Sequence, residues 1–502
     1  AERPRQAVVL IHGIGEQRPM DTLRAFVGSL LKKETYYSKP DELSGSFELR
    51  RLKLRRSIDS APPINARWPE TDFYEYYWAH QMYGTVISHI TGWIWRVMWR
   101  GLAALWSHDA RYHRRLKWLV PLVWTIALGA LVAAAYYLVG VVTDRTLPFQ
   151  ENVGKIGIGM ALAIVAWRLL RATLLAMITD VAGDAARYFD INPKNVARRY
   201  DILRGGVDML RKLHEDCDRD GDRKMFRYGR IVLIGHSLGS VIAYDILKHY
   251  FHEVNGHMSI DPRDFAGVEN FAGRNNGAPT FDGARPYSDA SEYRFHQRET
   301  WRTVNAATPS GSVLRAEVAT ASRWIVTDLI TMGSPMTYGP ILLADGLEDL
   351  NEKIRLRELP TCPPDRSHNL NQGRFTVMLS AEADRIVDYS ILQHHAYFAL
   401  TRWTNFYFHN DPVGGPLSAI FGNGIKDVHL KGPAYRPLAA HVSYWKRACK
   451  GGGRCLARVR KILTEPVNLC GVKDKDRYQA CRYARDAFRP SCPRNALASR
   501  DK

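Results

Sequence analysis

The stretch RIVLIGHSLGSVIAYDIL, residues 230–247, decides the fold of this chain. A run of β-branched and aliphatic residues ends at Gly235, a polar pair follows, and a helical pattern begins after Gly239, which predicts a strand, a very tight turn and a helix. The turn has the pattern G-x-S-x-G, in which a strained backbone exposes a serine hydroxyl, here that of Ser237 beside His236. We interpret Ser237 as a candidate nucleophile. The alternative is a tight turn that only needs small residues.

Candidate partners for this serine follow from the chemistry of the hydroxyl group. It becomes a strong nucleophile when a base takes its proton, and the base needs an orienting carboxylate. In chains with this turn, the acid follows a late strand and the histidine follows the acid. Asp411 comes after the strand-like run RWTNFYF, and His441 lies 30 residues beyond it, so they are the predicted acid and base. Asp384 is the reserve acid and His429 the reserve base.

Two backbone N–H groups are candidates for an oxyanion hole. Attack on an ester carbonyl creates an oxyanion, which needs donors held in fixed positions. Leu238 begins the predicted helix, where the helix dipole also favours negative charge. The loop LIHGIG at residues 10–15 follows an early strand pattern, and Ile14 in this loop is the second expected donor. We expect His12 to brace the loop rather than to act as a base.

Strand and helix patterns flank the Gly-His-Ser-Leu-Gly turn on both sides. A helix is predicted for DTLRAFVGSLLKK after the first strand, and a polar helical region for residues 180–216. The predicted strands are AVVLIHG, SFELRRLKL, TDFYEYYWA, WIVTDLITM and RWTNFYF.

Five segments together resemble the α/β-hydrolase superfamily, and more narrowly its serine lipases and esterases. They are VVLIHGIG, LIGHSLGSVIAYD, ITMGSP, NFYFHNDPVGG and the histidine that follows. The resemblance implies a mostly parallel central sheet flanked by helices, with Ser237 as nucleophile, Asp411 as acid, His441 as base, and Ile14 and Leu238 as oxyanion donors. It implies cleavage of carboxylic esters through an acyl-enzyme, without a metal or an organic cofactor. Acyl transfer by the same residues and an inactive membrane scaffold are the alternatives.

Two apolar segments between the predicted early strands and the serine turn suggest a membrane hairpin. Residues 118–143 contain no charged side chain, whereas about 20 apolar residues suffice to cross a bilayer. Residues 156–178 form a second apolar run, which predicts another span or a re-entrant helix, and the Trp-rich residues 93–106 predict an interfacial helix. Basic residues at 111–117 favour a cytoplasmic position for the flanking parts. We therefore expect a bacterial inner-membrane protein whose hydrolase domain faces the cytoplasm.

The end of the chain is strongly basic. The formal net charge is +19, and from Lys446 onward 16 Lys or Arg face 5 Asp or Glu. This charge favours an anionic phospholipid surface as a partner over a merely solvated tail, and no motif indicates nucleic acid. Reduced thiols are expected in this tail, with disulfides or zinc as alternatives, and a homo-oligomer is a further expectation. The tail cysteines are Cys449, Cys455, Cys470, Cys481 and Cys492.

The patterns divide the chain into a core with two insertions and a tail. The expected hydrolase core comprises residues 1–79, 180–250 and 324–448. Residues 80–179 form the membrane insertion, which would bring the site close to lipid or acyl-ester substrates. Residues 251–323 are the expected lid or cap, and residues 449–502 the basic tail.

Overall fold

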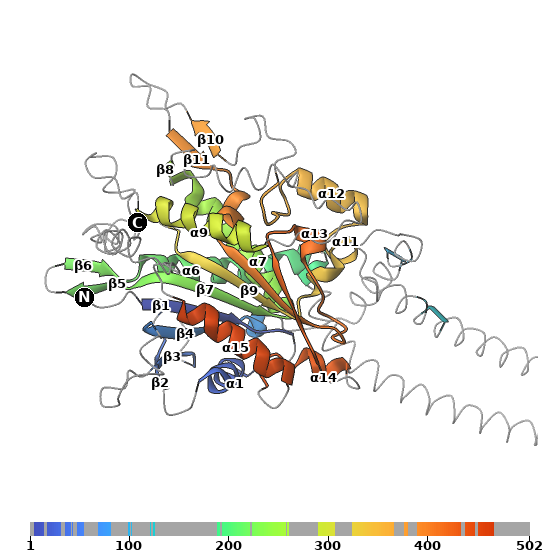
Figure 1. Ribbon diagram of the computed structural model, residues 1–502, viewed down its shortest axis with the longest axis horizontal. Helices are drawn as coiled ribbons and strands as arrows, with labels where there is room; N and C mark the ends of the chain where they lie inside the picture. Colours follow the sequence, from blue (N-terminus) through green and yellow to red (C-terminus); the bar gives the residue numbers. More distant parts are fainter. Residues whose placement is uncertain are drawn as a thin grey trace, which may run out of the picture.

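An eight-stranded sheet with strand order β13-β12-β9-β7-β1-β4-β3-β2 forms the centre of the protein (Figure 1). The strands from β13 to β4 run parallel, and β3 and β2 are antiparallel at one edge. The sheet strands are β1 (Arg5–Ile11), β2 (Tyr36–Pro40), β3 (Arg50–Leu54), β4 (Thr71–Tyr76), β7 (Tyr228–His236), β9 (Val326–Met332), β12 (Arg402–Phe408) and β13 (Lys426–Leu430).

This structure is a computed structural model. It describes residues 5–14, 18–31, 36–41, 43, 48–54, 69–81, 188–190, 193–220, 223–257, 259–260, 290–306, 324–365, 376–379, 389–432, 437–446 and 450–465, with isolated positions between 99 and 125. Its helices are α1 (Asp21–Leu30), α6 (Pro193–Glu215), α7 (Leu238–Val254), α9 (Ala290–Ala306), α11 (Gly339–Leu342), α12 (Leu347–Arg355), α13 (Ser418–Phe421), α14 (Pro437–His441) and α15 (Lys450–Thr464). Short 3-10 helices are η3 (Ala79–Gln81), η6 (Asn255–His257), η8 (Pro335–Tyr338) and η9 (Ala396–Ala399), and the small strands are β5 (Cys217–Asp220), β6 (Arg223–Phe226), β8 (Ser259–Ile260), β10 (Thr376–Leu379) and β11 (Tyr389–Leu392).

Helices cover both faces of the sheet, which explains why its central strands are apolar throughout. In β7, Ile231 and Leu233 belong to the core on the side of α6 and α7, whereas Val232 and Ile234 belong to the core that includes α1 and α15. Successive side chains of a strand point to opposite faces, and a parallel strand is buried on both. The prediction of an α/β fold with a mostly parallel sheet flanked by helices is therefore confirmed.

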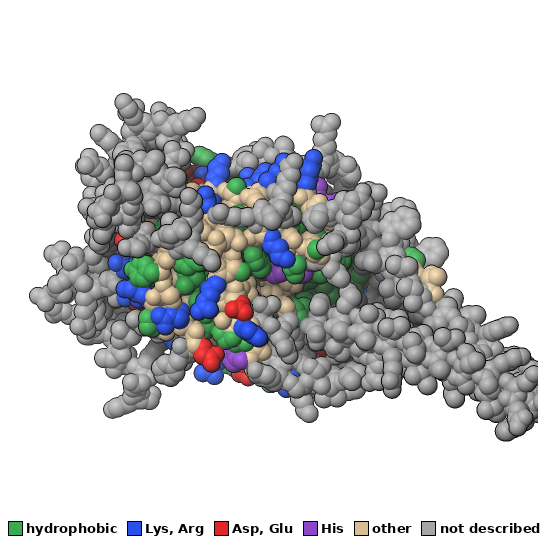
Figure 2. Space-filling view, turned by 90° about the horizontal axis from the view of Figure 1, so that it is seen from below, with side chains coloured by type: hydrophobic (Ala, Val, Ile, Leu, Met, Phe, Trp, Pro, Cys, Tyr) green, Lys and Arg blue, Asp and Glu red, His purple; other side chains and the backbone are tan. Residues whose placement is uncertain are grey.

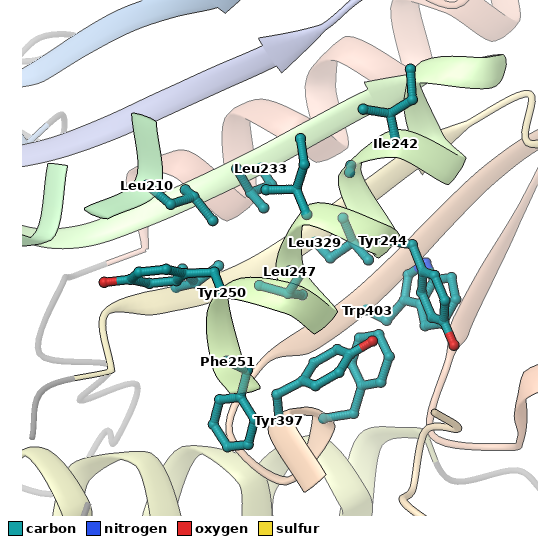
Figure 3. Close-up of a cluster of buried hydrophobic side chains, with 14 of the residues drawn as sticks. Leu210, Leu233, Ile242, Tyr244, Leu247, Tyr250, Phe251, Leu329, Tyr397 and Trp403 are labelled. Atoms are coloured by element: carbon teal, nitrogen blue, oxygen red, sulfur yellow. The ribbon is translucent and has the colours of Figure 1, made fainter. Parts of the chain in front are cut away.

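An aromatic cluster packs α7 against β12 and η9. Figure 3 shows Tyr244 of α7 beside Trp403 and Phe251 beside Tyr397. The ring centroids of Tyr244 and Trp403 are 5.5 Å apart, and Trp403 stacks on Phe398 at 4.7 Å. Such pairs each add about 0.5–1.5 kcal/mol beyond the burial of their surface. The cluster fixes α7, the helix that follows the serine turn.

The prediction of a lid over residues 251–323 is wrong for its described part. Residues 251–257 complete α7 and η6, and α9 is a core helix. The side chains of Tyr293 and Trp301 are buried, and Gln297 donates a hydrogen bond to the backbone carbonyl of Thr401 at 3.0 Å. Burial of these side chains attaches α9 to the sheet. Residues 261–289 and 307–323 lie outside the described residues.

The core of the protein extends into the region that was predicted as a basic tail. Helix α15 buries Cys455, Val459 and Leu463 against the sheet, so the core extends past residue 448. Gly451 and Gly452 lie within this helix, where Phe408 and the carbonyl oxygens of residues 431, 443 and 446 leave no room for a Cβ atom. Cys455 is a free, buried thiol whose pKa is raised by burial. Residues 466–502, and the other four tail cysteines, lie outside the described part.

The predicted membrane segments cannot be compared with the structure. Residues 82–98, 126–187 and most positions between them lie outside the described residues. In the part of the chain that the structure describes, no helix is both long enough and apolar enough to span a bilayer. The core meets this undescribed stretch at the end of η3 on one side and at Tyr188 on the other.

A buried ionic cluster joins the amino-terminal ends of the central strands. Asp328 of β9 accepts hydrogen bonds from Arg230 of β7 at 2.6 Å and from Arg402 of β12 at 2.9 Å. The side chains of all three residues are at most 2% exposed. Burial would raise the pKa of Asp328, but the two guanidinium groups outweigh it and hold this pKa well below its ordinary value. Asp328 therefore stays ionised and forms ion pairs with both arginines.

Candidate active site

The structure brings Ser237, His441 and Asp411 into one hydrogen-bonded chain. Nε2 of His441 is 2.9 Å from Oγ of Ser237, and Nδ1 of His441 is 3.0 Å from both carboxylate oxygens of Asp411. Ser237 follows β7, Asp411 follows β12, and His441 ends α14 after β13. Because these strands are parallel, their carboxyl ends meet at one edge of the sheet. The candidate nucleophile, base and orienting carboxylate are thus joined by successive hydrogen bonds.

The backbone at Ser237 is strained. Its φ is +53° and its ψ is −129°, a region that residues other than glycine rarely adopt. The N–H of Ser237 donates to the carbonyl oxygen of Met332 at 2.9 Å, and helix α7 begins at the next residue. A Cβ on Gly235 would come 2.5 Å from Cα of Ser240, and one on Gly239 would overlap the carbonyl oxygen of His12. Both glycines are required by this close packing.

Asp411 is held as a carboxylate. Its side chain accepts a hydrogen bond from the hydroxyl of Tyr444 at 2.6 Å and one from the N–H of Val413 at 2.8 Å, besides the contact with His441. Burial would raise the pKa of Asp411, but these hydrogen bonds outweigh it and lower the pKa to about 2. An ionised Asp411 fixes the Nδ1–H tautomer of His441, which leaves Nε2 free to accept the proton of the serine.

His236 supports the backbone of the base. Its Nε2 donates to the carbonyl oxygen of His441 at 2.9 Å, and the two imidazole rings are 4.9 Å apart. Burial and the neighbouring His441 lower the pKa of His236 to about 3, so this ring is neutral and acts as a donor. His236 was predicted only as part of the turn.

The loop after β1 lies against the nucleophile. A Cβ on Gly13 would come 2.8 Å from Cβ of Ser237, and Ile14 follows directly as a partly buried residue. Leu238 is the first residue of α7, where backbone N–H groups have no partner within the helix. Both predicted oxyanion donors therefore belong to segments that border Ser237.

His12 has the bracing position that the sequence predicted. Its Nδ1 is 2.8 Å from the carbonyl oxygen of Gly13, its ring stacks on Trp78 at 5.1 Å, and its own carbonyl oxygen accepts a hydrogen bond from the indole of Trp78. Burial lowers the pKa of His12 to about 4, so the ring is neutral near pH 7.

The reserve base His429 takes no part in the hydrogen-bonded chain of described residues. His429 lies on β13, and its ring is 5.4 Å from that of Tyr407 and 5.8 Å from that of His409. Asp384 lies outside the described residues. Sequence reasoning missed Tyr444, the hydrogen-bond donor to Asp411. Its only signal was its position three residues after His441.

The geometry defines a Ser-His-Asp site on an α/β protein. A comparison of the chain with models of protein families, with curated proteins and with solved structures gave no match.

Proposed function

We propose that the protein is a serine hydrolase of the α/β-hydrolase type that cleaves carboxylic esters. The observation that carries this proposal is the chain from Asp411 through His441 to Ser237, on a nucleophile with positive φ at the carboxyl edge of a parallel sheet. His441 would take the proton of Ser237 as its hydroxyl attacks the carbonyl carbon, and would return it to the leaving alcohol. Water would then release the acid by the same route.

Backbone donors would stabilise the charge that develops on the ester oxygen. The candidate donors are the N–H groups of Leu238, which follows Ser237 directly, and of Ile14, which follows Gly13 in the loop against Ser237. The dipole of α7 would favour an anion at its first turn. Ionised Asp411 would stabilise the imidazolium formed during attack. The described residues would thus supply a nucleophile, a base and an anion site.

We further propose lipid-like acyl esters as substrates and a position at the inner membrane. The support comes from the direction of β4 in the sheet. Strand β4 is parallel to β1, so its carboxyl end lies at the same edge as Ser237, and Trp78 just beyond it packs on His12. The last described element before the predicted membrane segments is η3, which follows Trp78 directly in the sequence. An insertion there would bring the site close to the bilayer surface.

Labelling with a fluorophosphonate probe tests the proposal. We expect a covalent adduct on Ser237 of the purified full chain, because only an activated serine attacks such a probe rapidly. Ser237→Ala should abolish the adduct, while Ser334→Ala should retain it, since the hydroxyl of Ser334 contacts Ser240 rather than His441. Mass spectrometry of the digested protein locates the adduct. An adduct elsewhere, or none on a folded wild type, would refute the assignment.

A further inference from the structure

A basic pocket lies far from the candidate active site. It has a volume of about 570 Å³ and opens between α9, α15 and the amino-terminal parts of β12 and β13. Arg402 begins β12 and lines the pocket, whereas Asp411 follows the other end of that strand. Seven extended residues span about 20 Å, so the two sites are separate. The charged residues of the lining are Arg294, Arg298, Arg402, Lys426, Arg458, Lys461 and Glu465.

The positive charge of the lining exceeds the negative charge of its carboxylate partners among the described residues, which are Glu465 and, for Arg402, also Asp328. Glu465 is the single carboxylate among the charged lining residues, and it already contacts Arg298 at 2.8 Å and Arg402 at 2.9 Å. Lys426, Arg458 and Lys461 have no ion pair with any residue that the structure describes. Figure 2, seen from the side of α15, shows Lys and Arg outnumbering Asp and Glu on the described part of this face.

Buried donors in the lining also lack acceptors. Nε of Arg402 and Nε of Arg298 are buried and have no hydrogen-bond partner among the residues that the structure describes. The side chain of Arg402 is 2% exposed. Burial, together with the charge of Arg402, lowers the pKa of Arg294 to about 10. Burial and nearby cations also lower the pKa of Lys426. A bound anion would reduce the repulsion between these cations and would accept hydrogen bonds from the buried N–H donors.

We propose that this pocket binds a phosphate-bearing ligand. Guanidinium groups match phosphate oxygens with paired N–H donors, and a cluster of six cations against one carboxylate suits a multiply charged phosphate better than a single carboxylate. The exposed side chain of Phe295 in the lining offers an apolar contact to the rest of the ligand. The source is a soluble phosphorylated compound or the headgroup of an anionic phospholipid. The proposal is independent of ester cleavage.

Titration calorimetry with pyrophosphate on the full chain tests the pocket. The double variant Arg458→Ala, Lys461→Ala removes two exposed cations of α15, so the fold should persist and the melting temperature without ligand should stay close to that of the wild type. We expect the affinity for pyrophosphate to fall about 100-fold, roughly tenfold for each cation lost. Arg454→Ala is the matched control, because Arg454 is exposed on the same helix but outside the lining. It should change the affinity less than twofold.

Vesicles separate the two sources of phosphate. Wild type and double variant are compared on phosphatidylcholine vesicles with and without phosphatidic acid. Pyrophosphate binding in solution that depends on the two cations identifies a soluble ligand. Binding that appears only with phosphatidic acid, and that the double variant loses, identifies a lipid headgroup. Failure of the wild type to bind either probe, or equal binding by the double variant, would overturn the proposal.

Discussion

Replacing Asp411 with asparagine is expected to lower kcat for a short p-nitrophenyl ester by about 10⁴-fold. The two oxygens of Asp411 receive donors from His441, Tyr444 and Val413. An amide leaves one oxygen, so at least one of these donors would face the NH₂ group. The negative charge that stabilises the imidazolium would also be lost. Steady-state kinetics of the purified variant measure the effect.

Two companion variants make this result specific. Asp384→Asn removes the reserve acid and should change kcat less than twofold. If Asp384→Asn lowered kcat more than Asp411→Asn does, Asp384 would be the acid instead. Tyr444→Phe keeps the charge of Asp411 and removes one donor at 2.6 Å, so we expect a fall of about tenfold. Melting temperatures within a few degrees of the wild type show that each variant is folded.

Replacing Asp328 with alanine is expected to lower the free energy of unfolding of the core by about 3–5 kcal/mol. Asp328 is the buried carboxylate between Arg230 and Arg402, and its removal leaves two buried guanidinium groups facing each other. Among the described residues, Arg230 would lose its ion pair, and Arg402 would keep only the one with Glu465, so the loss is far more costly than that of a surface pair. Urea unfolding followed by tryptophan fluorescence measures the change. Trp324 precedes β9 and Trp403 lies on β12, and both are buried in the folded protein.

An ion pair on the surface gives the control for this experiment. Asp349 and Lys353 are 3.0 Å apart, one turn apart on α12, with side chains that are 36% and 31% exposed. Asp349→Ala should therefore lower the free energy of unfolding by less than about 1 kcal/mol. Equal losses in the two variants would contradict a special role of the buried cluster.

The sequence predicted the sheet well because its central strands are continuous apolar runs. Residues 7–13 and 230–236 are buried on both faces, and tight turns end each run, so length and composition were enough. The chain order of Ser237, Asp411 and His441 was also sufficient to select the three residues that the structure places together. Local pattern and chain order therefore gave both the fold class and the candidate triad.

Interactions between distant segments explain what the sequence did not reveal. In α9, the buried Tyr293, Gln297 and Trp301 recur at helical spacing, but Gln297 is polar and so are many residues around them, which hid this buried face. Glycine has a low helix propensity, yet Gly451 and Gly452 belong to α15, where close contact with other segments leaves no room for larger residues. Tyr444 and Asp411 are 33 positions apart, so their contact depends on tertiary packing that a local sequence pattern does not show.

The order of strands in the sheet has a consequence for synthesis of the chain. Strand β1 is complete at Ile11, and β4 and β3 can pair beside it early. Its other neighbour, β7, begins only at Tyr228. At about 5–20 residues per second, the ribosome needs roughly 10–40 s to reach that strand. Throughout this interval the open edge of β1 is a template for wrong pairing, so nascent chains of this protein need protection until β7 has emerged.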